Sequence, residues 1–152
     1  MRSYILSVLV NNNFGVLTRI SGLFARRGYN IKSLTVGETL DPAISRMTIE
    51  CIGDEHTLIQ IQSQLKKVED VISVKELERE NSVYRELFLI RVGCRVGSLS
   101  DIIKNFDCRV LSESENYTVC EVCGENTDFE RFCKLASEYG TIDVARTGIT
   151  AI

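Results

Sequence analysis

Residues 11–34 read NNNFGVLTRISGLFARRGYNIKSL, and this stretch sets the fold that we expect around it. Its apolar side chains recur at intervals of three, four and one residues, which places them on one face of a helix. Gly28 comes directly after two arginines, a pattern typical of a helix C-terminus. The stretch therefore predicts an amphipathic helix that ends at Gly28 and continues into a strand. The apolar face of this helix consists of Val16, Ile20, Leu23 and Phe24.

Strands and a second helix are predicted on both sides of this first helix. The first strand is nearly all apolar, as a central strand covered on both faces would be. Asp54 is placed to cap a second helix with Leu58, Ile61 and Leu65 on its inner face. The order β-α-β-β-α-β predicts a ferredoxin-like α+β domain, with a four-stranded antiparallel sheet and both helices on one face. We expect its strands at residues 4–10, 30–39, 44–52 and 71–77.

The second half of the chain repeats this order of elements, which predicts two ferredoxin-like βαββαβ-type domains. A polar linker at 79–83 separates a first domain at 1–78 from a second at 84–152. Apparent capping boxes at Ser98–Asp101 and Thr127–Glu130 predict the starts of its helices. We expect the inner face of the last helix to hold Phe129, Phe132, Cys133, Ala136 and Tyr139, and strands near 108–113, 117–123 and 141–149.

Composition limits the classes of function. The chain has 152 residues, of which 44% are hydrophobic and 26% charged, as in ordinary globular proteins. A net charge of -3 argues against a protein that neutralises nucleic-acid or membrane phosphates. We find no export signal and expect a cytoplasmic protein. Each half is small, so burial against a second copy would help it, and we expect at least a homodimer.

The six cysteines are expected to be reduced thiols. Cys120 and Cys123 form a C-x-x-C motif, which can hold zinc or act in redox chemistry. Here the motif lies in a predicted strand, where an odd separation sends the two thiols to opposite faces. His56 is the single histidine, and no nucleophile motif accompanies it. We therefore expect no metal site and no catalytic residue.

The loop at 11–15 lies between the first strand and the first helix. Backbone N–H groups of Gly15, Val16 and Leu17 would be unpaired donors at the positive end of the helix dipole, which suits a carboxylate. Amide oxygens of the asparagines could accept from an ammonium group. An amino acid carries both groups. Spacing alone also allows a plainer interpretation, in which Asn13 or a neighbour caps the helix and Gly15 only makes a turn.

Two longer stretches carry a resemblance to a known family. They read SVLVNNNFGVLTRISGLFARRGYNIKSLTVG at 7–37 and SRMTIECIGDE at 45–55, and both closely resemble the small, regulatory subunit of acetolactate synthase (acetohydroxyacid synthase). The first half of that subunit is an ACT domain, and the match runs across residues 3 to about 77. ARTG at 145–148 also resembles the family's terminal strand.

This resemblance implies a subunit of branched-chain amino acid biosynthesis that makes no product itself. It would bind the large catalytic subunit, raise its activity and transmit feedback inhibition by valine or a related branched-chain amino acid. The chain would need no cofactor of its own, because thiamine diphosphate, magnesium and any flavin would belong to the partner.

The resemblance also implies an effector site between two ACT domains paired edge to edge. On this sequence the matching residues are Asn12, Gly15, Val16 and Leu17 of one protomer, with Asn30 and Ile31 of the other.

Two other functions remain open at this point. A ferredoxin-like RNA-binding module should display stacking aromatic residues on its central strands, and the predicted strand at 44–52 has none. The second alternative is a free-standing ACT protein that senses amino acids with another partner. Co-purification with acetolactate synthase would distinguish it from a regulatory subunit of that enzyme.

Overall fold

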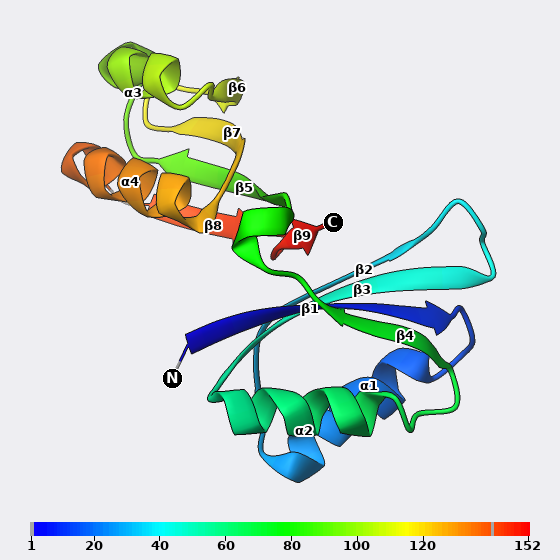
Figure 1. The fold of residues 1–152 in the computed structure, drawn as a ribbon. Helices are drawn as coiled ribbons and strands as arrows, with labels where there is room; N and C mark the ends of the chain where they lie inside the picture. The colour runs from blue at the N-terminus through cyan, green and yellow to red at the C-terminus, as the bar shows by residue number, and fades with distance from the viewer. Residues whose placement is uncertain (1, 141) are drawn as a thin grey trace. The chain divides into compact units, whose positions relative to one another are not determined.

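The computed structural model describes residues 2–140 and 142–152. The chain forms two compact units, and each contains its own sheet and helices (Figure 1). The first unit runs to Val83 and includes Ile149–Ile152, and the second covers Tyr84–Gly148. The expected second domain at 84–152 thus differs from the second unit by its last four residues.

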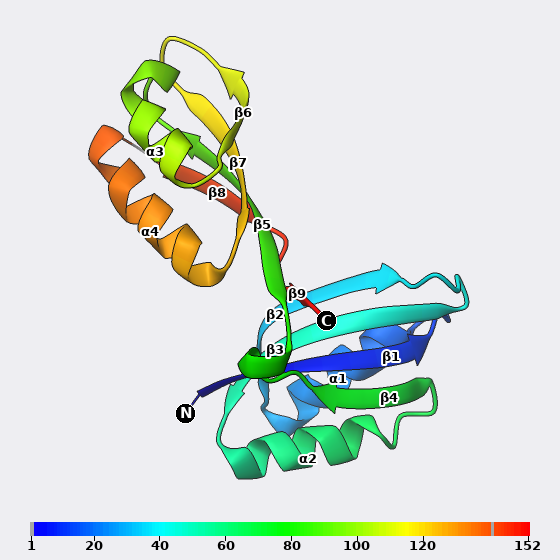
Figure 2. The ribbon, with the colours of Figure 1, turned by 45° about the horizontal axis from the view of Figure 1, so that its top comes forward.

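A four-stranded antiparallel sheet in the order β2-β3-β1-β4 forms the first unit. Both helices cover one face of this sheet (Figures 1 and 2). This is the predicted ferredoxin-like arrangement. Its elements are β1 (Arg2–Asn11), α1 (Val16–Arg27), β2 (Asn30–Glu38), β3 (Ile44–Gly53), α2 (Glu55–Leu65) and β4 (Val71–Glu76).

Alternation along the strands and a helical repeat along α1 build the core of this unit. Alternate β1 residues point toward the helices, and the face of α1 predicted from residues 11–34 packs against them. Asp54 caps α2 as expected, since its carboxylate accepts a hydrogen bond from Thr57 N at 2.8 Å. The core residues that these elements contribute are Tyr4, Leu6, Val8, Val10, Val16, Ile20, Leu23, Phe24, Leu58, Ile61 and Leu65.

The chain returns to the first unit at its C-terminal end. Ile149 and Ala151 are buried there, and Thr150 of β9 (Thr150–Ala151) lines a pocket together with Thr35 and Thr48 of the sheet. Thr35 Oγ1 donates to Ile149 O at 2.6 Å. Val83 and Ile152 exchange backbone hydrogen bonds of 2.9 and 3.1 Å. These contacts fasten the C-terminal segment to the first unit.

The second unit repeats the architecture with a sheet in the order β6-β7-β5-β8. Phe88 and Phe132 lie at its centre, fully buried between the sheet and the helices. The fold class is therefore confirmed for both halves of the chain. The elements are β5 (Tyr84–Val92), α3 (Ser100–Asn105), β6 (Arg109–Glu113), β7 (Thr118–Gly124), α4 (Asn126–Ala136) and β8 (Ile142–Arg146).

Both capping boxes predicted for this unit are wrong. A 3-10 turn over Val96–Leu99 precedes α3, so Ser98 already lies in a turn, and the cap position falls on Leu99 without a side-chain bond. In α4 the capping box is formed by Glu125 and Asp128, two residues before the predicted pair. The helix therefore starts earlier, at Asn126.

Two further expectations for this unit need comment. Tyr139 was expected on the inner face of the last helix, but it lies in the 3-10 turn that follows α4 and is 40% exposed. The strand expected at 141–149 is shorter, since β8 ends at Arg146, and Thr141 lies outside the described residues.

Among the described residues, no helix combines the length and the apolar character that crossing a lipid bilayer requires.

Candidate functional site

The loop between β1 and α1 is held by hydrogen bonds from its asparagines. Asn12 Nδ2 donates to Glu38 Oε1 at 3.1 Å and to Pro42 O at 3.0 Å. The backbone N–H of Asn12 donates to Ala43 O at 2.7 Å. The loop therefore lies against the tip of the β2–β3 hairpin. Because the side-chain nitrogen of Asn12 is used in this way, its Oδ1 is the atom left to face a ligand.

Asn13 joins the loop to the start of β4. Its Nδ2 donates to Asp70 Oδ1 at 3.1 Å, and Arg19 of α1 pairs with the second oxygen of the same carboxylate. These hydrogen bonds from Asn13 and Arg19 hold the pKa of Asp70 below its ordinary value. Sequence reasoning missed Asp70 and Arg19, because their pairing depends on tertiary structure and no local pattern marks it.

The N-terminus of α1 is open to a ligand. Gly15 occupies the cap position with φ 81°, in the left-handed region that glycine adopts without strain. Within the described part of the chain no side chain caps the helix, and its first turn contains no acidic residue. The interpretation in which Asn13 caps the helix is therefore wrong, since its side chain is used by Asp70 instead. The first-turn N–H groups and the helix dipole together make a positive site of the kind that binds carboxylates.

Val16 and Leu17 contribute to this end of the helix differently. Val16 is 3% exposed and packs in the core, so only its backbone can face a ligand. Its N–H donates to Asn13 O at 3.4 Å, so it is not the unpaired donor that the sequence predicted. Leu17 is 47% exposed. A hydrophobic contact at the mouth of this site would therefore come from Leu17.

The structure does not bring Asn30 and Ile31 to this loop within one chain. Asn30 pairs with Ile52 at one end of β3, whereas Asn11 pairs with Ile44 at the other end. Eight residues of β3 separate the two places, or about 27 Å at ~3.4 Å per residue. The six expected effector residues thus form two separate groups in a single copy.

The two thiols of the C-x-x-C motif point in opposite directions, as predicted. Cys120 is buried in the second unit and Cys123 is exposed, so the two thiols lie on opposite faces of β7. Among the residues described, no group of three or more histidine, cysteine, aspartate or glutamate side chains is arranged to hold a metal ion.

Comparison with known proteins identifies the family. Residues 6–73 match the family model described as the AHAS small subunit-like ACT domain. Residues 85–152 match the model described as the small subunit of acetolactate synthase. The second match covers the half of the chain in which the sequence offered the fewest recognisable residues.

Curated relatives and a solved structure agree with these matches along the whole chain. The probable acetolactate synthase small subunit of Methanothermobacter thermautotrophicus is 42% identical, over 99% of this chain and 92% of the relative. The acetolactate synthase isozyme 3 small subunit of Escherichia coli is 37% identical, over 97% and 93%. The crystal structure of the Thermotoga maritima acetolactate synthase small subunit superposes with a TM-score of 0.90 at 35% identity, over 100% and 97%. The chain therefore belongs to the family of acetolactate synthase small subunits.

Proposed function

We propose that this chain is the non-catalytic regulatory subunit of an acetolactate synthase. It binds the large catalytic subunit, raises its activity and confers feedback inhibition by valine in branched-chain amino acid biosynthesis. Thiamine diphosphate and magnesium belong to the catalytic partner. Family membership supports the partner, and the ACT domain supports an amino acid as effector.

The uncapped N-terminus of α1 is the observation that carries the effector site. Gly15 lets a ligand approach the backbone closely, and no acidic side chain in the first turn opposes a carboxylate. The N–H group of Leu17 would bind that carboxylate, and the Val16 N–H would join it by exchanging its long 3.4 Å bond to Asn13 O for the ligand. Asn12 Oδ1 would accept from the ammonium group. Hydrogen bonds to charged groups contribute about 1.5 to 3 kcal/mol each, so a few of them suffice without a deep pocket.

A second copy of the chain would complete this site. β2 is an edge strand, with one side free to pair. If two β2 strands pair antiparallel, the start of one strand lies beside the end of the other. Asn30 and Ile31 of the second copy would then lie near Glu38, whose carboxylate accepts from Asn12. The pairing therefore unites the two groups of residues that a single copy keeps apart.

A site shared by two copies gives valine a way to act on the enzyme. An effector shifts an equilibrium only when it binds one state more tightly than the other. Closure of the site depends on how two copies are paired, so valine favours the arrangement in which both halves meet. By linkage, an arrangement of the catalytic complex that separates the two halves weakens valine binding. Valine disfavours that arrangement by the same free energy.

Substitution of Gly15 tests this placement. Gly15→Asp places a carboxylate where the effector's own carboxylate is expected, and we expect valine binding to weaken by about tenfold or more, or at least ~1.4 kcal/mol. Activation of the catalytic subunit should persist. Calorimetry with valine and assays of inhibition in the reconstituted complex measure the two effects.

Two variants separate charge from backbone strain in this test. Gly28 ends the same helix with φ 68°, so Gly28→Asp carries a similar backbone cost at the opposite end of α1. Gly15→Asn has nearly the same shape as the aspartate and no charge. Both should keep most of the valine response. Normal inhibition in Gly15→Asp, or equal loss in Gly28→Asp, would exclude the proposed site.

A further inference from the structure

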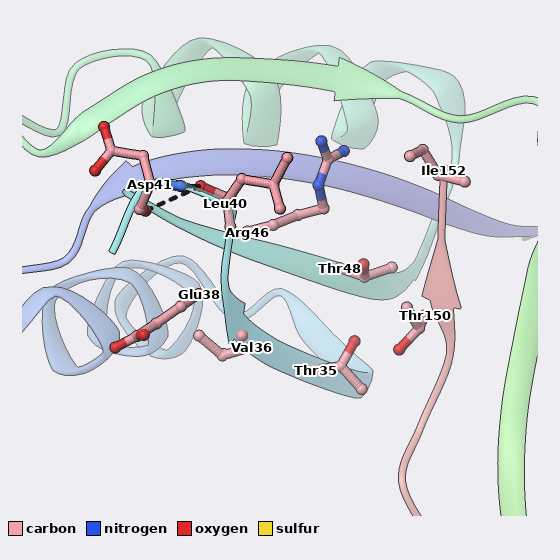
Figure 3. A pocket seen from close by; sticks show the side chains of 11 residues that line it. Thr35, Val36, Glu38, Leu40, Asp41, Arg46, Thr48, Thr150 and Ile152 are labelled. Atoms are coloured by element: carbon pink, nitrogen blue, oxygen red, sulfur yellow. Dashed lines mark hydrogen bonds between the residues drawn. The ribbon is translucent and has the colours of Figure 1, made fainter. Parts of the chain in front are cut away.

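A pocket of about 660 Å³ lies in the first unit, beside the β2–β3 hairpin (Figure 3). β2, β3 and the C-terminal segment form its walls, and all its lining residues belong to this unit. Its volume falls within the range of small-molecule sites in proteins. The lining residues that carry our argument are Thr35, Leu40, Arg46, Thr48, Thr150 and Ile152.

The pocket opens on the sheet face opposite α1 and α2. Thr35 pairs with Thr48 and Gly37 with Arg46, and these residues alternate with Leu34, which packs against the helix-side core. Side chains of Thr35, Arg46 and Thr48 consequently point to the face without helices. None of the six expected effector residues lines the pocket. The pocket therefore borders the effector loop, through the bond from Asn12 to the lining residue Glu38, without sharing its residues.

Arg46 supplies a positive charge that is paired with no carboxylate of the residues the structure describes. It is half-buried, and among the described residues its guanidinium makes one hydrogen bond, from Nη1 to Ser7 Oγ at 2.9 Å. A guanidinium has five N–H donors in a planar fork that suits a carboxylate. Most of these donors therefore remain available to a bound anion.

Acidic groups at the hairpin limit how much negative charge the pocket accepts. Asp41 Oδ1 accepts from Ala43 N at 2.9 Å, and Glu38 Oε1 accepts from Asn12. Both carboxylates belong to lining residues, so an anion beside Arg46 also meets negative charge nearby. A single carboxylate is favoured over a dianion or a phosphate for this reason.

The remaining lining fits an uncharged aliphatic body. Leu40 and Ile152 border the pocket from opposite sides, and Figure 3 shows the Arg46 side chain between them. Thr48 and Thr150 add hydroxyl and methyl groups. Apolar groups beside a few polar and charged ones are the usual composition of a site for a small organic acid, and Arg46 is the cationic group among them here.

We propose that this pocket binds a small aliphatic monocarboxylate, with the carboxylate on Arg46 and the hydrocarbon part against Leu40 and Ile152. The site uses none of the six expected effector residues and needs a single copy of the chain.

Isovalerate is a suitable probe, because it has one carboxylate and a branched aliphatic body. Titration into the full-length ¹⁵N-labelled chain should shift the amide resonances of Thr35, Thr48 and Thr150 saturably. Isovaleramide has the same shape without the charge, and it should produce no saturable shift. Equal binding of acid and amide would overturn the proposal, because it would leave Arg46 without a role.

Variants assign the binding to this pocket. Arg46→Gln should raise the Kd for isovalerate at least tenfold. Arg46→Lys keeps the charge and should raise this Kd by a smaller factor. Arg26→Gln changes an exposed arginine of α1 and should leave the Kd unchanged. Leu40→Glu alters a fully exposed residue, so it cannot disturb the core, and its added charge should also weaken binding.

Binding must also be distinguished from occupation of the effector loop. Gly15→Asp should bind isovalerate as the wild-type chain does. An unchanged Kd in both Arg46→Gln and Leu40→Glu would contradict the proposal. Shifts confined to the amides of Gly15, Val16 and Leu17 would contradict it as well.

Discussion

Glu50 is a buried carboxylate whose charge is balanced by its neighbours. It is 5% exposed on the sheet face without helices. Ser3 Oγ donates to it at 2.6 Å and Lys32 Nζ at 2.9 Å. Burial opposes ionisation, but these hydrogen bonds outweigh it, so the pKa of Glu50 lies below its ordinary value of 4.5. The ionised carboxylate therefore stabilises the first unit.

Because its pKa is lowered, Glu50 makes a contribution to the free energy of unfolding that depends on pH. The folded-state pKa is lower than the unfolded value, so its contribution to the free energy of unfolding is present above 4.5 and is lost as the pH falls through the folded value. Glu50→Gln should be less stable than wild type at neutral pH, and the difference should narrow in acid. Urea denaturation across this pH range measures it.

Glu113→Gln is the control for this experiment, since Glu113 is exposed on β6. It should unfold close to wild type at neutral pH. A difference between Glu50→Gln and wild type that stays constant from neutral pH into acid would show that the ionised carboxylate is not what stabilises the fold.

The second unit also contains a buried carboxylate, Glu86, and Arg146 is its cationic partner. Its Nε and Nη2 donate to the two oxygens of Glu86 at 2.8 and 2.7 Å. The Glu86 side chain is only 3% exposed. The guanidinium also lies over the Phe129 ring, 4.2 Å from its centroid. The ARTG stretch that resembles the family's terminal strand thus contains the residue that neutralises a buried carboxylate.

Removing one partner of this pair should be costly. Arg146→Met leaves the buried Glu86 carboxyl without its cationic partner, so we expect a loss of about 3–5 kcal/mol in the free energy of unfolding. The double variant Arg146→Met with Glu86→Gln removes both charges and should recover part of the loss. Arg95→Met breaks an exposed pair with Glu115 and should cost no more than about 1 kcal/mol. Equal losses in Arg95→Met and Arg146→Met would refute the assignment.

At the scale of helices and strands, the pattern of apolar residues predicted the first unit well. Val16, Ile20, Leu23 and Phe24 are buried as expected, because one helical face must meet the sheet. Strand positions followed from a nearly all-apolar run for β1 and from alternation for β3. Contacts across the sheet were beyond this reasoning. Asp70 meets Asn13 and Arg19 only because β4 pairs with β1 in a particular register.

Helix caps were the least predictable feature. The pattern of a capping box fits both Thr127–Glu130 and, with acidic residues at both positions, Glu125–Asp128. The structure uses the second, in which Glu125 N donates to Asp128 Oδ2 at 3.0 Å. Which pair caps the helix depends on where β7 ends, at Gly124, and local sequence does not fix that point.

The two edge strands of the first sheet should respond differently to a charge. Val36 on β2 is 46% exposed, and Ile72 on β4 is 50% exposed. A lysine on an edge strand disfavours pairing with another chain. Val36→Lys should therefore weaken the homodimer and valine binding together, whereas Ile72→Lys should affect neither. Sedimentation and calorimetry on the same samples measure both. A Val36→Lys chain that remains dimeric and still binds valine would exclude pairing through β2.

The whole molecule joins two units of the same topology in one chain. Family models match both units, and the Thermotoga maritima structure covers the full length. The first unit carries the expected effector loop and the pocket beside the hairpin. The sequence resembled the family most clearly in that unit, where the quoted stretches at 7–37 and 45–55 lie. In the second unit, the ion pair of Glu86 with Arg146 and a packed hydrophobic core stabilise the same fold.

The most direct test of our account is acetolactate formation from pyruvate by the purified catalytic subunit, measured alone, with this chain, and with this chain plus valine. We expect the chain to raise the rate and valine to suppress the increase, while valine leaves the catalytic subunit alone unaffected. A rate that the chain does not change, or an increase that valine does not reduce, would contradict the account.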